Sequence, residues 1–166
     1  MKFSNRVLLA AALSVAVVTA PIPLAAAPNP PVSGYPPNVD IGAVVTNTLR
    51  TAGTFTAEPG TANTQWRGVL CTLKVATESG SPSTTFSIQG YDSANAIWQT
   101  IATSGAVTGT TNPGAVLIYP GAALTTTPTG WVLNAVHLPP RWRVSQTIGG
   151  TGGPAITGKV GCSYLN

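Results

Sequence analysis

The feature that most constrains the fold is a period-two alternation of apolar and polar side chains in short segments. In one such segment Val69, Cys71, Leu73 and Val75 occupy every second position, and polar residues fill most of the positions between them. Alternate residues of a strand point to opposite faces, so this pattern is typical of half-buried strands. From about Val39 onward no window of a dozen residues shows a helical stripe. The alternation therefore predicts an all-β body.

Turn residues divide this body into eight expected strands. Pro-Gly pairs stand in three of the intervening turns, and Gly149–Pro154 is expected to be a flexible loop tip. The spacing predicts an antiparallel β-sandwich, jelly-roll or immunoglobulin-like, rather than βαβ units. The expected strands are Thr51–Thr56, Arg67–Thr77, Thr84–Asp92, Ile97–Thr103, Ala115–Tyr119, Trp131–Leu138, Arg141–Ile148 and Ile156–Tyr164.

Two segments precede the expected domain at residues 47–166. Residues 1–27 combine the basic Lys2 and Arg6 with an apolar run at Val7–Val18 and the small residues Ala25–Ala27. This is the pattern of a secretion signal, and the run is too short to span a bilayer comfortably as a helix. The alternative interpretation is an uncleaved apolar arm that docks onto a partner subunit. Residues 28–46 are expected to form a proline-rich, extended spacer.

Charge is scarce and thinly spread. Only 7% of the 166 residues are charged, and 18 glycines and 15 prolines contribute to the composition. The net charge is +4, and two of the eight Lys/Arg residues lie in the first 27. Arg141 and Arg143 are the one local basic pair of the body. Nucleic-acid binders cluster their positive charge, so the pattern argues against a nucleic-acid partner.

The two cysteines, Cys71 and Cys162, both fall on the apolar faces of expected strands. One interpretation is a disulfide, which requires the two strands to be neighbours and suits an extracellular or particle protein. The other is a pair of small buried side chains that never join. The residues alone leave both open.

The sequence contains no motif for catalysis, a cofactor or a metal. Its one histidine, His137, stands between apolar neighbours, and the four carboxylates are scattered. No Cys/His cluster has the spacing of a metal site, and neither a nucleophile elbow nor a phosphate-binding loop is present. We therefore expect a non-enzymatic protein without cofactors.

The segment Leu138–Val144 supplies the candidate partner contacts. Its two prolines predict a corner, and Trp142 should then face the core with Val144. Arg141 and Arg143 would project from the opposite face toward an acidic partner. Two aromatic residues, Trp98 and Tyr91, are expected near each other and facing outward. Such aromatics suit either subunit packing or a sugar-stacking platform, and we favour packing.

Several of these segments resemble small proteins encoded among the virion structural genes of tailed bacteriophages. The similarity rests on Thr85–Asp92, Trp98–Ile101, Ile118–Gly121 and Leu138–Val144, and extends over roughly residues 47–165. The resemblance implies a virion structural protein, such as a capsid-decoration subunit, that forms homo-oligomers and binds coat subunits. It supplies no catalytic residues. The alternative is a secreted bacterial β-sandwich that binds a glycan or another surface, which the signal-like N-terminus favours.

Overall fold

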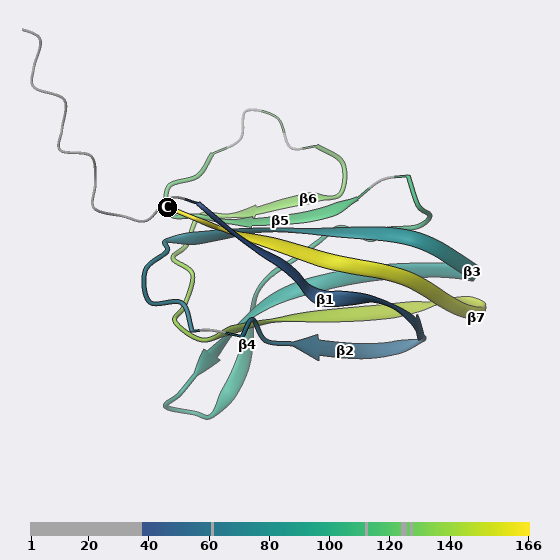
Figure 1. Cartoon of the computed structure of the whole chain (residues 1–166), viewed down its shortest axis with the longest axis horizontal. Coiled ribbons are helices and arrows are strands. Elements are labelled where there is room, and N and C mark those ends of the chain that lie inside the picture. The colour runs from purple at the N-terminus through teal and green to yellow at the C-terminus, as the bar shows by residue number, and fades with distance from the viewer. Residues whose placement is uncertain (1–37, 61, 112, 124–125, 127) are drawn as a thin grey trace, which may run out of the picture. The chain divides into compact units, whose positions relative to one another are not determined.

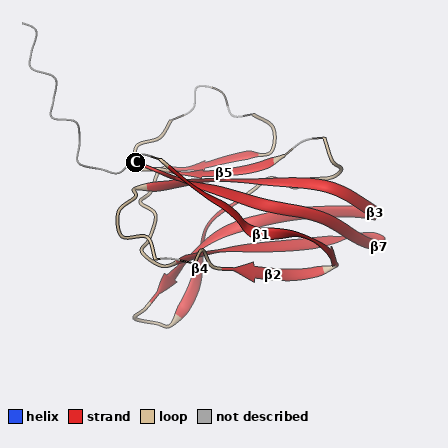
Figure 2. Ribbon diagram, viewed as in Figure 1, coloured by secondary structure: helices blue, strands red, loops and turns tan. Residues whose placement is uncertain are grey.

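The structure is a computed structural model that describes residues 38–166 apart from 61, 112, 124–125 and 127. Every regular element in these residues is a β-strand (Figures 1 and 2), which confirms the all-β prediction. The described residues include no helix long and apolar enough to cross a membrane. The strands are β1 (Val39–Thr51), β2 (Gly53–Ala57), β3 (Gly68–Asp92), β4 (Ile97–Thr103), β5 (Gly114–Ile118), β6 (Trp131–Asn134) and β7 (Trp142–Leu165).

The two longest strands, β3 and β7, form the centre of the fold. They pair antiparallel from Gly68 opposite Leu165 to Gly90 opposite Trp142. The sequence pattern predicts two strands in each of these regions, separated in the second case by a loop at Gly149–Pro154. That expectation is wrong, because residues 149–151 stay paired with β3 and the whole segment remains within β7. Glycine and proline here bend the ladder at a register shift between Ser79 and Ser81, and the pairing resumes on both sides of it.

The bend turns β7 back on itself. Trp142 and Tyr164 are 22 residues apart, yet the indole Nε1 of Trp142 donates a 3.2 Å hydrogen bond to the Tyr164 hydroxyl. A straight strand would separate them by about 70 Å. Gly150, Gly152 and Gly153 have φ angles of 125°, 71° and 70°, in the region that glycine tolerates best. Figure 1 shows both long strands running to one end of the body and turning back there.

The bend divides the β3–β7 ladder into two halves. We call residues 68–79 of β3 with residues 155–165 of β7 the first half. Residues 81–92 of β3 with residues 142–151 of β7 are the second half. In the first half β1 pairs with β7 and β5 pairs with β3. In the second half β2 pairs with β7 and β4 pairs with β3.

One strand departs from the antiparallel arrangement that the sequence predicts. β6 pairs parallel with β5, from Ala115 opposite Trp131 to Ile118 opposite Asn134, so the sheet is mixed. The tight turn predicted at Tyr119–Gly121 is present, closed by a 3.1 Å hydrogen bond from the backbone N of Ala122 to the carbonyl oxygen of Tyr119. It begins a connection of about a dozen residues, which is long enough for a crossover to a parallel partner.

The β-sheet body also begins earlier than residue 47. The expected leader at residues 1–27 and residues 28–37 of the expected spacer lie outside the described residues. Residues 39–46, however, belong to β1, which pairs with β7 from Val39 opposite Tyr164. The predicted boundary at 47 is therefore wrong. Val45 is 2% exposed and belongs to the core, which explains why this segment joins the sheet.

The core contains the faces that the alternation predicts. The four alternating residues from Val69 to Val75 are at most 4% exposed, as are Trp142 and Val144. The Tyr164 ring stacks on Trp66 with ring centroids 4.3 Å apart and meets Trp142 edge-on at 6.0 Å. Burial raises the pKa of Tyr164, and the hydrogen bond from Trp142 opposes this shift. These aromatic contacts hold the two ends of β7 together.

Candidate functional site

The four residues predicted as partner contacts come together in the second half. Tyr91, near the end of β3, and Trp98, near the start of β4, are directly opposed in the strand ladder. Their ring centroids are 5.1 Å apart and their planes are tilted by 55°. The guanidinium of Arg141 lies over both rings, and that of Arg143 lies over Trp98. We call these four residues the arginine–aromatic cluster.

Arg141 is held by a carboxylate and by the two rings. Its Nε and Nη2 donate hydrogen bonds to the two carboxylate oxygens of Glu58, both at 3.2 Å. Its guanidinium carbon lies 4.4 Å from the Tyr91 ring centroid and 5.1 Å from that of Trp98. The hydrogen bonds with Glu58 raise the pKa of Arg141 above its ordinary value. The side chain is nevertheless 53% exposed, so a partner can reach it.

Arg143 is held through its Nε atom, and its two terminal nitrogens remain available to a partner. Its Nε donates a 2.8 Å hydrogen bond to Oε1 of Gln89, and its guanidinium carbon lies 4.3 Å from the Trp98 ring centroid. Within the described part of the chain, its terminal nitrogens make no hydrogen bond. Those nitrogens are the atoms that bind carboxylates in pairs. Arg143 is therefore oriented in advance for an acidic group.

The arrangement favours a carboxylate-bearing partner over a sugar. Cation–π contacts at exposed sites contribute about 0.5–1 kcal/mol each, enough to limit the freedom of the two arginines. The same contacts place guanidinium groups over both rings, and Trp98 carries two of them. A sugar that stacks on Trp98 would have to compete with these arginines for the ring faces.

Two rows of hydroxyl side chains lie beside the cluster on the second half. They are formed by cross-strand neighbours that are exposed or half-buried, except for Ser145, which is buried. Each row contains a hydrogen bond between hydroxyl groups, Thr54 with Thr147 at 3.2 Å in the first and Ser87 with Thr103 at 2.8 Å in the second. The surface they make is polar but uncharged. The first row contains Thr54, Thr147 and Thr85, and the second contains Thr56, Ser145, Ser87 and Thr103.

His137 shares its surroundings with one carboxylate, that of Asp92. It is exposed in the connection between β6 and β7, where it lines a shallow hollow of about 290 Å³ with Asp92 and Ile101. The Asp92 carboxylate accepts hydrogen bonds from the backbone N of Ala94 at 2.9 Å and from Nδ2 of Asn95 at 2.8 Å. The hydrogen bond from the Asn95 side chain is the main reason why the pKa of Asp92 is lowered. Asp92 is thus a turn-stabilising carboxylate rather than one poised to accept a proton.

No metal centre is apparent in the described residues, where no three His, Cys, Asp or Glu side chains gather closely enough to hold an ion. The two cysteines form a disulfide in the first half. Cys71 and Cys162 are directly opposed on β3 and β7, with Cα atoms 4.1 Å apart and sulfurs 2.04 Å apart. Both residues are at most 2% exposed. The disulfide therefore links the two central strands within the core.

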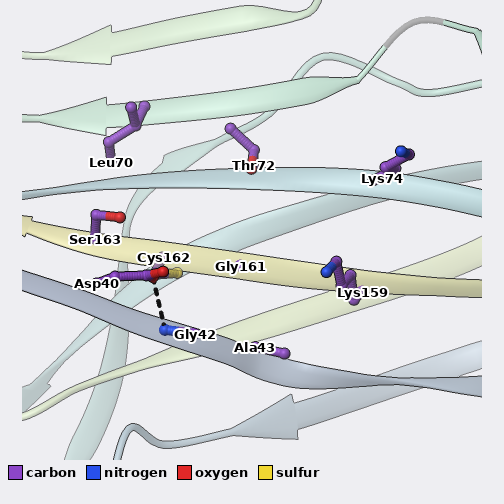
Figure 3. A pocket seen from close by; sticks show the side chains of 10 residues that line it. All are labelled: Asp40, Gly42, Ala43, Leu70, Thr72, Lys74, Lys159, Gly161, Cys162 and Ser163. Atoms are coloured by element: carbon purple, nitrogen blue, oxygen red, sulfur yellow. Dashed lines mark hydrogen bonds between the residues drawn. The ribbon is translucent and has the colours of Figure 1, made fainter.

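A second hollow, also of about 290 Å³, lies on the outer face of the first half (Figure 3). Lys74 and Lys159, which are directly opposed, line one end of it, and Asp40 and Ser163 line the other. Gly161 lies between the two ends, on the central strand of the floor. Sequence reasoning missed this site, because its residues come from three strands and their register decides their proximity.

No family model, no curated protein and no solved structure matches this chain. The geometry of the candidate site therefore carries the functional argument. Sequence reasoning found the four members of the arginine–aromatic cluster but not Glu58, which is 83 residues from Arg141. The sequence places Glu58 in a turn and gives no signal of that contact.

Proposed function

We propose that this chain is a non-enzymatic structural subunit of a phage particle, a capsid-decoration or other particle-surface protein that binds neighbouring coat subunits. The observation that carries the proposal is the arginine–aromatic cluster. It gathers two arginines, a tryptophan and a tyrosine on one area, where Arg141 is exposed and the other three are half-buried. Arginine and aromatic residues are the types enriched in the cores of protein interfaces and among their energetic hot spots.

The surroundings of the cluster support a protein partner. The neighbouring hydroxyl rows carry no charge, so covering them with another subunit removes no ion from water. The bound Glu58 neutralises one of the two arginines and leaves one positive charge in excess. An acidic side chain of a coat subunit would match that excess. The resemblance to virion structural proteins, though short in each segment, is consistent with this chemistry.

We also propose that the two halves form the two sheets of a β-sandwich and that the chain acts as a homo-oligomer. The core residues of both halves belong to one hydrophobic cluster, which favours two facing sheets. β1 and β6 lie at the two ends of the main strand order. Terminal strands present unpaired backbone groups that can pair with another copy.

The alternative function is that of a secreted module that binds a glycan or another cell surface. The contact between Tyr91 and Trp98 favours it, because adjacent partly exposed aromatic rings can stack on sugars. The protein would then act outside the cell rather than on a virion. Substituting Trp98→Ala would abolish glycan-array binding under this alternative. An array without any signal from the wild-type protein removes it.

Sedimentation velocity of the full-length chain, followed by co-sedimentation with phage particles purified from its host, tests the particle proposal. We expect oligomers or particle-bound copies. The double substitution Arg141→Ala/Arg143→Ala should weaken this binding about tenfold or more, since a hot-spot side chain contributes about 2 kcal/mol. Arg50→Ala is the matched control, because Arg50 also lies over an aromatic ring, 5.5 Å from that of Phe55. A strictly monomeric chain that ignores particles would contradict the proposal.

The mass of the mature N-terminus separates the two functions. An intact Met1, or Lys2 after removal of Met1, in particle-bound protein supports the virion role. A start at Ala26 or Ala27 supports export and the secreted alternative. Mass spectrometry of the purified protein measures this directly, without a variant.

A further inference from the structure

Two features of the hollow in Figure 3 lower the stability of the sheet when no ligand is bound. The first is the Lys74–Lys159 pair. These residues are directly opposed on β3 and β7, and both are exposed on the same face. Like charges in this position repel each other. Within the described residues neither lysine makes an ion pair that would offset the repulsion.

The second unfavourable choice is Gly161. Its φ angle is not positive. The nearest atom to a Cβ at this position would be the carbonyl oxygen of Gly42, at 3.7 Å. The backbone therefore accepts alanine at this position. Glycine inside a strand reduces stability, and it often marks a place where a ligand approaches the backbone closely. Gly161 is opposed to Thr72, which also lines the hollow, so a side chain at 161 would project into the space.

A bound anion explains both choices. We propose that this hollow binds a phosphate group, either free or at the end of a larger ligand, between the ammonium groups of Lys74 and Lys159. A phosphate monoester carries a charge of about −1.5 to −2 at pH 7, which matches two lysines. Lysine binds phosphate as a point charge, whereas paired carboxylate recognition favours arginine. The site is separate from the arginine–aromatic cluster and goes beyond the proposed particle role.

The surroundings of the hollow fit this ligand. The hydroxyl of Thr72 lines it near the lysines, and that of Ser163 lines it at the other end. The one carboxylate, Asp40, lies at the end away from the lysines and accepts a 2.8 Å hydrogen bond from the backbone N of Gly42. Beneath the hollow the Cys71–Cys162 disulfide joins the two strands that carry both lysines. The floor is therefore held in place before any ligand arrives.

Two-dimensional ¹H–¹⁵N NMR of the full-length chain tests the proposal, with inorganic phosphate titrated at an ionic strength held constant with chloride. We expect saturable shifts of the Lys74, Lys159 and Gly161 amides. Lys74→Gln and Lys159→Gln should each weaken binding at least fivefold. Arg50→Gln, which removes one positive charge elsewhere, should not. Shifts that do not saturate, or that chloride reproduces, would overturn the proposal.

The decisive variant is Gly161→Ala. It should raise the thermal midpoint in chloride and weaken phosphate binding at least fivefold, because the methyl group occupies the floor. Gly149→Ala is the matched control in the same strand, since a Cβ there meets nothing closer than 4.0 Å. It should leave phosphate binding unchanged. Wild-type affinity in Gly161→Ala would refute the site. Acetate that binds as tightly as phosphate would overturn the assignment to phosphate.

Discussion

The two halves of the β3–β7 ladder share the same two strands but differ in what holds them and in what they present. The first half is joined by the Cys71–Cys162 disulfide, which lies between β1 and β5 in the strand order. The second half has no covalent link and ends in the arginine–aromatic cluster. Its exposed positions carry hydroxyl rows, whereas those of the first half carry two opposed lysines and Gly161. One ladder thus supports two chemically distinct surfaces.

Stability and recognition are therefore distributed unevenly along the same two strands. The disulfide fixes the register of the first half whatever its surface residues are. The second half relies on noncovalent contacts, among them the Glu58–Arg141 ion pair, whose side chains are 44% and 53% exposed. Exposed ion pairs contribute little, about 0–1 kcal/mol. We therefore expect the second half to open locally more often than the first.

Removing the disulfide should have the largest effect on this difference. The Cys71→Ala/Cys162→Ala variant removes the cross-link that closes a loop of 91 residues. The chain-entropy relation gives a loss of about 4–5 kcal/mol, and measured losses are commonly about 2–5 kcal/mol. Urea unfolding measures the change. Hydrogen exchange should show the two halves becoming more alike, and unchanged protection of the first half would show that the disulfide is not the source of the difference.

A methyl group at the bend should have an intermediate effect. Gly150 has a φ of 125°, and a Cβ there would lie 2.1 Å from the carbonyl oxygen of Ser81. Gly150→Ala must therefore displace backbone where the ladder passes from one half to the other, and we expect a loss of about 1–3 kcal/mol. Gly149→Ala, one residue earlier, meets no such obstacle and should be neutral or slightly stabilising. Thermal unfolding of the two variants compares them, and equal midpoints would contradict a strained bend.

The smallest effect concerns the turn between β3 and β4. Hydrogen bonding, above all from the Asn95 side chain, lowers the Asp92 pKa from its ordinary value of 3.8. The ionised carboxylate therefore contributes stability above pH 3.8 that is lost as the pH falls through the lower folded-state pKa. Asp92→Asn should remove this part of the acid sensitivity. Unfolding midpoints measured from pH 6 down to about pH 2 test it. A steeper acid decline in the variant than in the wild type would have the wrong sign.

Local pattern predicted most of the strands, but it missed β1 (Val39–Thr51) and the continuity of β3 and β7. The alternation placed β4 at Ile97–Thr103, where the structure has it, and correctly predicted that Trp142 and Val144 are buried. It did not predict that Ser145 and Gln146 are buried as well. It failed at Gly149–Pro154, because turn residues signal both a loop and a bent strand. It also failed at β6, because the choice between parallel and antiparallel partners depends on the path of the connection. Neither property is encoded in a short window.

The candidate sites were likewise only partly predictable from the sequence. The outward phase of Arg141 and Arg143 follows from the buried Trp142 between them, and the outward phase of Trp98 was anticipated as well. Their closeness to one another depends on the β3–β4 and β3–β7 registers. The contact with Glu58 and the opposition of Lys74 to Lys159 are set entirely by long-range pairing. Sequence can nominate such residues singly, but register brings them together.

The continuous β3–β7 ladder has a consequence for how quickly the chain can acquire its structure. Cys71 and Cys162 become neighbours only after the intervening β4, β5 and β6 segments have been enclosed in a loop. Folding dominated by such distant pairings is slow, in the millisecond-to-second range for small β-proteins. Cysteine oxidation reports that the correct register has been reached at this point of the ladder. The rate at which the disulfide appears during refolding therefore times the closure of this 91-residue loop.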